Sequence, residues 1–93
     1  MSLYSKDDLP FYHDYDYRYI REVRHLRNLT LIEFSTYMKV DSSDLSRLEN
    51  GLMQFSIHYK SKFNEALQEL SVSNLELLSV KRVIELKEQR GIK

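Results

Sequence analysis

The chain contains very few residues that force a turn. It has two glycines and one proline in 93 residues, and these residue types most often interrupt helices and strands. Leu, Glu, Lys, Arg and Gln, which favour helices, dominate the segments after residue 17. The sequence therefore predicts an all-α protein, and its length suits one small domain with a modest hydrophobic core.

Capping residues divide the chain into predicted helices. Asp16 is placed to cap the first helix, and Asn28 to end it, because asparagine tolerates the left-handed conformation that follows many helices. Thr30 and Glu33 form the capping-box pattern that opens a second helix. We expect this second helix to end near Lys39.

The third predicted helix is short and begins after Asp41, whose carboxylate we expect to accept backbone N–H groups. Asn50 and Gly51 supply its stop. The remaining capping positions are Ser56 for a fourth helix, Ser73 with Glu76 for a fifth, and Gly91 as the stop of the fifth. Together these signals predict a compact five-helix bundle.

The link between the second and third helices is the most informative part of this pattern. Only Lys39 and Val40 separate the expected end of one helix from the cap of the next. Two helices joined by so short a turn must cross steeply instead of lying antiparallel. The spacing therefore predicts a helix-turn-helix.

The charges are balanced overall but unevenly distributed. Fourteen basic residues match 14 acidic ones, which gives no global attraction to nucleic acid or to an anionic membrane. Residues 1–16 sum to minus three, whereas residues 17–40 hold five basic and two acidic residues and sum to plus three. Local attraction of phosphate is therefore permitted around residues 17–40.

Several functional classes lack the residues that they need. Cysteine is absent, and His13, His25 and His58 do not have the spacing of metal ligands. No glycine-rich phosphate loop or paired nucleophile and base is present, so we expect neither an enzyme nor a cofactor. With no long apolar run and no signal peptide, we expect a soluble, cytoplasmic, unprocessed protein that does not enter a membrane.

Three segments carry a resemblance to a known family: IREVR, LTLIEFSTYMKV and DSSDLSRLENG. The run from Ser46 to Gly51, in register with the two preceding helices, is the most specific part. From Ile20 to Leu70 the chain resembles the phage repressor and Cro-like helix-turn-helix family, also called the Xre family. The resemblance implies a lambda repressor-like DNA-binding fold whose third helix enters the major groove of an operator.

Matching positions imply particular roles for individual residues. Arg24 and Glu49 correspond to an internal ion pair of the family. The residues implied at the DNA are Thr30, Ser42, Ser43, Ser46, Arg47, Asn50 and Gln54. The chain departs from the family at Leu31, where glutamine is common, and at Lys39, where glycine is usual; Ser42 and Ser43 stand where glutamine or arginine is frequent.

The remaining segments suggest contacts with a partner. Residues 1–15 form an aromatic, acidic head, residues 16–72 the helix-turn-helix domain, and residues 73–93 a C-terminal helix. Apolar residues of this last helix spread over more than one stripe, so one side can cover the bundle and another can contact a second subunit. The head can fold back on the bundle or dock on that subunit. The predicted interface comprises Tyr12, Tyr15, Leu77, Val80, Val83 and Ile84.

Two functions remain open. The resemblance implies a homodimeric transcriptional regulator of phage or mobile-element type, which acts as a repressor by occupying its operator. The alternative is a module that keeps the helix-turn-helix fold but binds another regulator or an enzyme. The neutral total charge, the serine-rich third helix and the acidic aromatic head favour this alternative.

Overall fold

The computed structural model describes residues 15–91, and in this range it contains α-helices and no strands. The helices are α1 (Arg18–Leu26), α2 (Leu31–Met38), α3 (Ser42–Glu49), α4 (Ile57–Glu69) and α5 (Asn74–Gln89). The predicted all-α class and the number of helices are thereby confirmed. Most of the predicted aromatic head, including Tyr12, lies outside the described residues.

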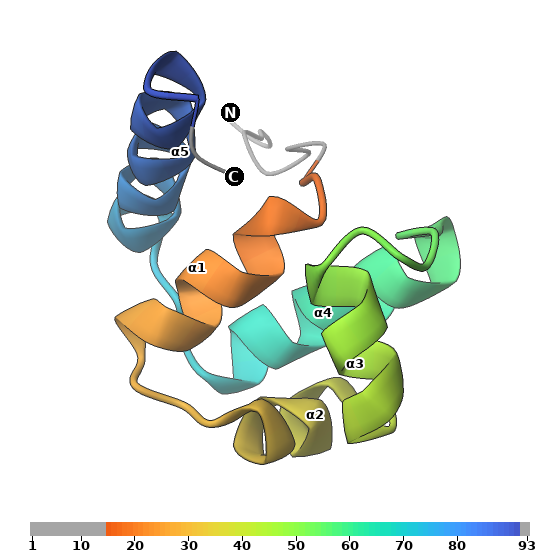
Figure 1. The fold of residues 1–93 in the computed structure, drawn as a ribbon. Coiled ribbons are helices and arrows are strands. Elements are labelled where there is room, and N and C mark those ends of the chain that lie inside the picture. The colour runs from red at the N-terminus through yellow and green to blue at the C-terminus, as the bar shows by residue number, and fades with distance from the viewer. Residues whose placement is uncertain (1–14, 92–93) are drawn as a thin grey trace.

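Helix α1 lies at the centre of the arrangement. Figure 1 shows α5 standing along one side of α1, with α2, α3 and α4 gathered on the other. Helix α1 contacts both α5 and α3, while α2 packs on α3 and α4. The fold thus has two parts that meet at α1, and every part of the candidate site is positioned relative to this helix.

The hydrophobic core forms around the ring of Phe63 on α4, which is fully buried. Its centroid lies 5.4 Å from that of Tyr15, 6.2 Å from that of Phe34 and 5.9 Å from that of Phe55, all in edge-to-face geometry. Such aromatic pairs add stabilisation beyond the burial of their surface. The other buried apolar residues are Ile20, Val23, Met38, Leu45, Leu48, Ala66, Leu67, Leu77, Val80 and Ile84.

The two predicted capping boxes are present. The Thr30 hydroxyl accepts a hydrogen bond from the Glu33 backbone N–H at 3.1 Å, and the Glu33 carboxylate accepts one from the Thr30 N–H at 2.8 Å. Ser73 and Glu76 repeat this exchange at 3.2 and 2.8 Å. These reciprocal bonds satisfy N–H groups that the helix itself leaves without partners, and they fix the starts of α2 and α5.

Three other capping predictions require correction. Helix α1 begins one residue later than expected, with Tyr17 at the cap position, although the Asp16 carboxylate still accepts from the Arg18 N–H at 2.7 Å. Asp41 and Ser56 occupy the cap positions of α3 and α4, but neither side chain makes a capping hydrogen bond. Asp41 instead borders an open groove that Lys62 also lines.

Left-handed residues end several helices. Asn28 has φ 55°, as predicted for the residue that ends α1. Gly51, with φ 72°, follows α3, and a Cβ atom there would lie 3.1 Å from Cζ of Tyr17. A side chain at this position would therefore be both conformationally strained and crowded. Lys39 has φ 59° although it carries a full side chain. This conformation costs lysine more steric energy than it costs asparagine or glycine at the other two positions.

The connection between α2 and α3 is short and well anchored. Residues 39–41 are all that separate the two helices, and Figure 1 shows α2 and α3 crossing at a steep angle. The Val40 N–H donates to the Ser35 carbonyl at 3.1 Å. Ser35 is itself buried, and its small side chain lets the helices approach each other. The hydrogen bond and the packing hold α3 in one orientation on α2.

Ion pairs and apolar contacts attach α5 to α1. Arg27 binds the Glu76 carboxylate at 2.8 Å and also donates to the Ser71 carbonyl at 3.1 Å. The Arg27 guanidinium, with help from Ser73, lowers the pKa of Glu76 from its ordinary value of 4.5 to about 2. Lys87 pairs with Glu22 near the other end of the contact.

Within residues 15–91, no helix combines the length and apolar character required to cross a membrane.

The burial of most of its described residues contradicts the predicted partner interface. Leu77, Val80 and Ile84 lie in the core of the chain itself, with 7%, 2% and 5% of their surfaces exposed. Tyr15 is also buried, and burial raises the pKa of its hydroxyl. Side chains already buried within one subunit cannot also form a contact surface for another. Of the predicted residues that the structure describes, only Val83 is exposed.

The left-handed conformation of Lys39 makes a prediction about stability. Lys39→Gly should stabilise the protein by up to about 1 kcal/mol, because glycine adopts this conformation without the steric cost that a Cβ atom brings. Glu65→Gly, at an exposed position inside α4, should destabilise it by about 0.5 kcal/mol because glycine is a poor helix former. Urea unfolding measures both changes, and a loss of stability in both variants would contradict this account of Lys39.

Candidate nucleic-acid interface

The outer face of α3 is polar and accessible. Ser43, Arg47 and Asn50 are exposed, and Ser42 and Ser46 are partly exposed. The side chains of Leu45, Leu48 and Glu49 are buried on the opposite face. The helical period therefore brings the five residues predicted from α3 and its C-cap onto one surface. The other two predicted residues, Thr30 at the start of α2 and Gln54 in the loop after α3, are exposed but belong to different segments.

Arg47 already has an acidic partner on this face. Its Nη1 lies 2.7 Å from Oδ1 of Asp44, one helical turn earlier, and the two side chains are 56% and 30% exposed. An exposed pair of this kind contributes only about 0.2–1 kcal/mol. Arg47 can therefore leave Asp44 for another acceptor at low cost, but the released carboxylate then remains beside the same surface.

Asn50 is held by hydrogen bonds within the chain. Its Oδ1 accepts from Nη2 of Arg21 at 2.7 Å, and its Nδ2 donates to the Ser46 carbonyl at 2.8 Å. Both ends of the amide are thus occupied. In this conformation Asn50 connects the end of α3 to α1 and has less freedom to contact a phosphate or base.

The capping box at the start of α2 also limits what Thr30 can bind. Its N–H and hydroxyl are both used in the capping box with Glu33. The Glu33 carboxylate carries negative charge at the start of α2, where an approaching phosphate would be repelled. An anion at this position would therefore have to displace or tolerate Glu33.

A buried ion pair fixes the inner side of α3. The Glu49 side chain is only 2% exposed, and its two oxygens accept from Nε and Nη2 of Arg24 at 2.7 and 3.0 Å. Arg24 also donates from Nη1 to the Leu29 carbonyl at 3.2 Å. The hydrogen bond to Glu49 raises the pKa of Arg24. Arg24 and Glu49 thus form the internal pair that the family resemblance implied.

Sequence reasoning missed a second arginine at Glu49. Nε of Arg21 lies 3.5 Å from Oε1 of Glu49, a longer separation than either contact made by Arg24. Arg21 and Arg24 are three residues apart on α1 and therefore share a face of the helix. That spacing is the signal that could have identified Arg21.

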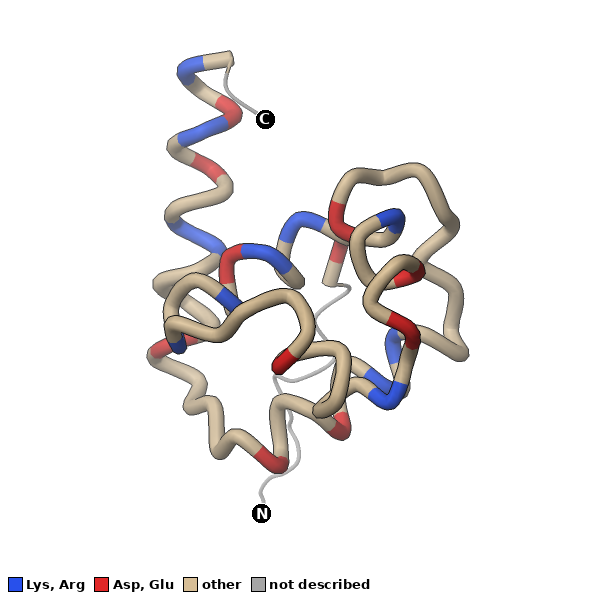
Figure 2. Tube along the Cα trace, turned by 60° about the horizontal axis from the view of Figure 1, so that its bottom comes forward, with Lys and Arg blue, Asp and Glu red and all other residues tan. Residues whose placement is uncertain are grey.

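Most of the basic residues that give residues 17–40 their predicted positive charge form ion pairs within the chain. The arginines of this segment pair as follows: Arg18 with Asp16 and Glu88, Arg21 and Arg24 with Glu49, and Arg27 with Glu76. Their acidic partners neutralise most of the charge that a linear count assigned to this segment. Figure 2 shows Lys and Arg interspersed with Asp and Glu along the described trace. The arginines of α1 therefore do not form a free basic surface.

The groove beside the start of α3 has a mixed charge as well. It is lined by Lys39, Lys62 and His58 together with Asp41 and Asp44. Nζ of Lys62 donates to the Lys39 carbonyl at 3.2 Å. The two aspartates oppose the attraction of these lysines for phosphate.

Within residues 15–91, no group of three or more His, Cys, Asp or Glu side chains is arranged to hold a metal ion. Comparisons of the chain with protein-family models, curated proteins and solved structures found no match. The candidate site is a polar face of α3 with one exposed arginine, Arg47. The buried ion pair of Arg24 and Glu49 lies on the inner side of the same helix.

The two arginines at Glu49 should differ in their contribution to stability. Arg24→Met should lower the free energy of unfolding by about 3 kcal/mol, because it leaves the buried carboxylate of Glu49 with only the longer contact to Arg21, at 3.5 Å. Arg21→Met, which keeps both short contacts of Arg24, should cost about 1 kcal/mol or less. Urea unfolding of the two variants distinguishes these roles, and equal losses would show that Arg21 matters as much as Arg24.

Proposed function

We propose that this protein is a small DNA-binding transcriptional regulator that inserts α3 into the major groove. The observation that carries the proposal is the steep crossing of α2 and α3 across a three-residue connection, with a polar face of α3 turned outward. This is the arrangement in which a recognition helix projects from its support. The resemblance of residues 20–70 to the phage repressor and Cro-like family points to the same function.

The side chains on α3 define how such a protein would read DNA. Serine hydroxyls at 42, 43 and 46 can both donate and accept, so they discriminate weakly between bases. Arg47 can bind O6 and N7 of a guanine in a bidentate manner once it leaves Asp44. Sequence preference would therefore be concentrated at the base pair that Arg47 contacts, and the mode of regulation would be repression through operator occupancy.

This function predicts a specific effect of Arg47. Selection of duplexes from a random DNA pool at about 50 mM and about 200 mM salt should enrich a two-fold motif, more strongly at low salt. Arg47→Ala should weaken binding to the best site by about 5- to 150-fold and relax the preference at one position of each half-site. Arg90→Ala removes the same charge from the exposed C-terminal end of α5, beyond its apolar residues, and should leave the motif unchanged.

A protein-interaction module is the second candidate. It is favoured by the internal pairing of the arginines of α1 and by the hydrogen bonds that occupy Asn50. Absence of any enriched motif at both salt concentrations, from a sample shown to be folded, would reject sequence-specific DNA binding. That result would leave the interaction module as the function to pursue.

We also propose that the regulator is a homodimer assembled through α5. Exposed apolar residues remain on this helix after it has packed on α1: Leu75, Leu78, Val83 and Leu86. Their positions are symmetric about a point between Val80 and Lys81, close to the middle of the helix. In an antiparallel pair of α5 helices, Leu75 would therefore face the Leu86 position, and Leu78 the Val83 position, of the second copy. Such self-complementarity is what a two-fold interface requires.

The dimer proposal predicts the effect of a charge on this surface. Leu78→Glu should convert the dimer to a monomer, because it places two carboxylates in the apolar contact. Leu52→Glu, at a position that is 77% exposed in the loop after α3, should leave the mass unchanged. Sedimentation equilibrium measures the mass of each, and a monomeric wild-type protein at about 100 μM would reject an α5 dimer that forms at ordinary working concentrations.

A further inference from the structure

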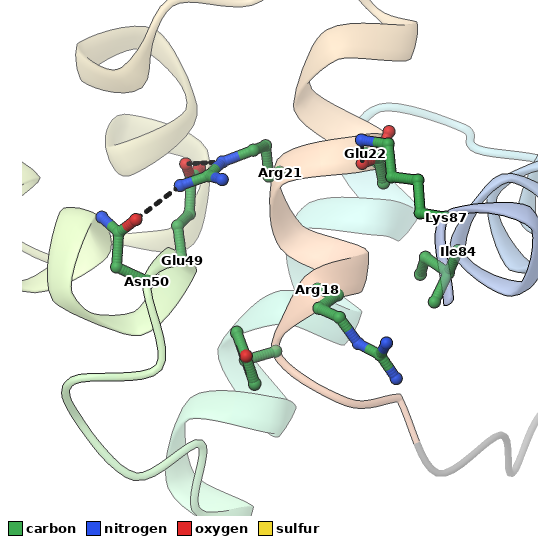
Figure 3. A pocket seen from close by; sticks show the side chains of 8 residues that line it. Arg18, Arg21, Glu22, Glu49, Asn50, Ile84 and Lys87 are labelled. Atoms are coloured by element: carbon green, nitrogen blue, oxygen red, sulfur yellow. Dashed lines mark hydrogen bonds and ion pairs between the residues drawn. The ribbon is translucent and has the colours of Figure 1, made fainter. Parts of the chain in front are cut away.

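A small cavity lies where α1, the end of α3 and α5 meet. It has a volume of about 150 Å³. Its lining comprises residues of the α1 segment, the end of α3 and α5: Tyr17, Arg18, Arg21, Glu22, Glu49, Asn50, Ile84 and Lys87. Figure 3 shows Arg21 turned toward Glu49 and Asn50, with Ile84 and Lys87 on the opposite side of α1. Apart from Asn50, none of these residues belongs to the predicted DNA-contact set.

The basic residues of the cavity differ in how well they are paired. Lys87 is bound to Glu22, and Arg18 contacts Asp16 and Glu88 at 2.6 and 2.8 Å. Arg21 reaches a carboxylate only at 3.5 Å. Of the cations that line the cavity, Arg21 is therefore the one without a short ion pair.

The weak pairing of Arg21 has a structural cause. Both oxygens of Glu49 already accept hydrogen bonds from Arg24 at 3.0 Å or less. The short bond that Arg21 does make, at 2.7 Å, goes to the neutral amide oxygen of Asn50. A guanidinium has five N–H donors and binds carboxylates in a bidentate manner more strongly than it binds amides. An incoming carboxylate would thus be a better acceptor than Asn50.

The two carboxylates of the lining already have cationic partners, because Glu22 is paired with Lys87 and Glu49 with Arg24, and part of the remaining lining is apolar. The cavity is bordered by the ring of Tyr17 and by Ile84, whose side chain is almost fully buried. A cavity of this size is large enough for a single aromatic ring. An arginine without a short ion pair beside an apolar part of the wall is the pattern of a small-ligand site, in which a polar group fixes orientation and apolar surface supplies affinity.

We propose that this cavity binds a small monocarboxylate with a one-ring aromatic body. The carboxylate binds Arg21, and the ring lies against Tyr17, whose own ring borders Gly51 at the end of α3. Binding draws Arg21 away from Asn50 and so loosens one of the links between α1 and the end of α3. The proposal concerns the cavity alone and does not require that the protein bind DNA.

Benzoate is the probe for this site, and benzamide is its neutral counterpart of the same shape. In a titration followed by ¹H–¹⁵N NMR, benzoate should give saturable shifts at residues 17–22, 49–51 and 84–88, half-complete at about millimolar concentration. Benzamide should bind about tenfold more weakly because it lacks the charge that strengthens the hydrogen bonds. Equal binding of the two probes, or benzoate shifts confined to other residues, would overturn the proposal.

Two matched variants test the role assigned to Arg21. Arg21→Gln should weaken benzoate binding at least about tenfold by removing the charged donor, while Arg24 continues to hold Glu49. Arg82→Gln removes one positive charge from an exposed site on α5 outside the cavity and should bind benzoate as the wild type does. The dispersion of the NMR spectrum establishes that each variant is folded. Unchanged affinity in folded Arg21→Gln would also overturn the proposal.

Discussion

The buried carboxylate of Glu49 is the constraint on which the orientation of α3 depends. Removing a carboxylate from water costs several kcal/mol unless a cation and further hydrogen bonds replace the lost solvation. Arg24 supplies both at 2.7 and 3.0 Å. Any rotation of α3 about its axis would pull Glu49 away from Arg24 or expose Leu45 and Leu48. The ion pair and the core together therefore determine that Ser42, Ser46 and Arg47 face outward.

Features that depend on neighbouring residues could be predicted from the sequence. The capping boxes at Thr30 and Ser73 need only a partner three residues away, so the local pattern contains all the required information. Asp41 occupies the cap position of α3 without a capping hydrogen bond, and the residue three positions after it is Asp44 instead of the glutamate that completes the other two boxes. The complete box, and not the capping residue alone, therefore distinguishes Thr30 and Ser73 from Asp41.

Charge counting and apolar periodicity failed for a related reason. The predicted excess of positive charge around residues 17–40 ignored acids that are distant in sequence, such as Glu76 opposite Arg27 and Glu88 opposite Arg18. The apolar residues of α5 likewise cover two sides of the helix, and periodicity alone cannot decide which side packs on α1. Docking buries Leu77, Val80 and Ile84 and leaves Leu75 and Leu78 exposed. Most of the residues predicted for the partner surface of α5 therefore lie on the side that packs within the chain itself.

The arginines of the α1 segment divide their contacts between two neighbours. Arg21 and Arg24 bind the end of α3, while Arg18 and Arg27 bind α5. The proposed DNA-reading face and the proposed dimer face are thus attached to the same central helix. In a dimer joined through α5, the distance between the two α3 helices would be set by this one rigid connection. A change at Arg21 that loosened α3 would then alter the alignment of α3 with its half-site without touching either contact surface.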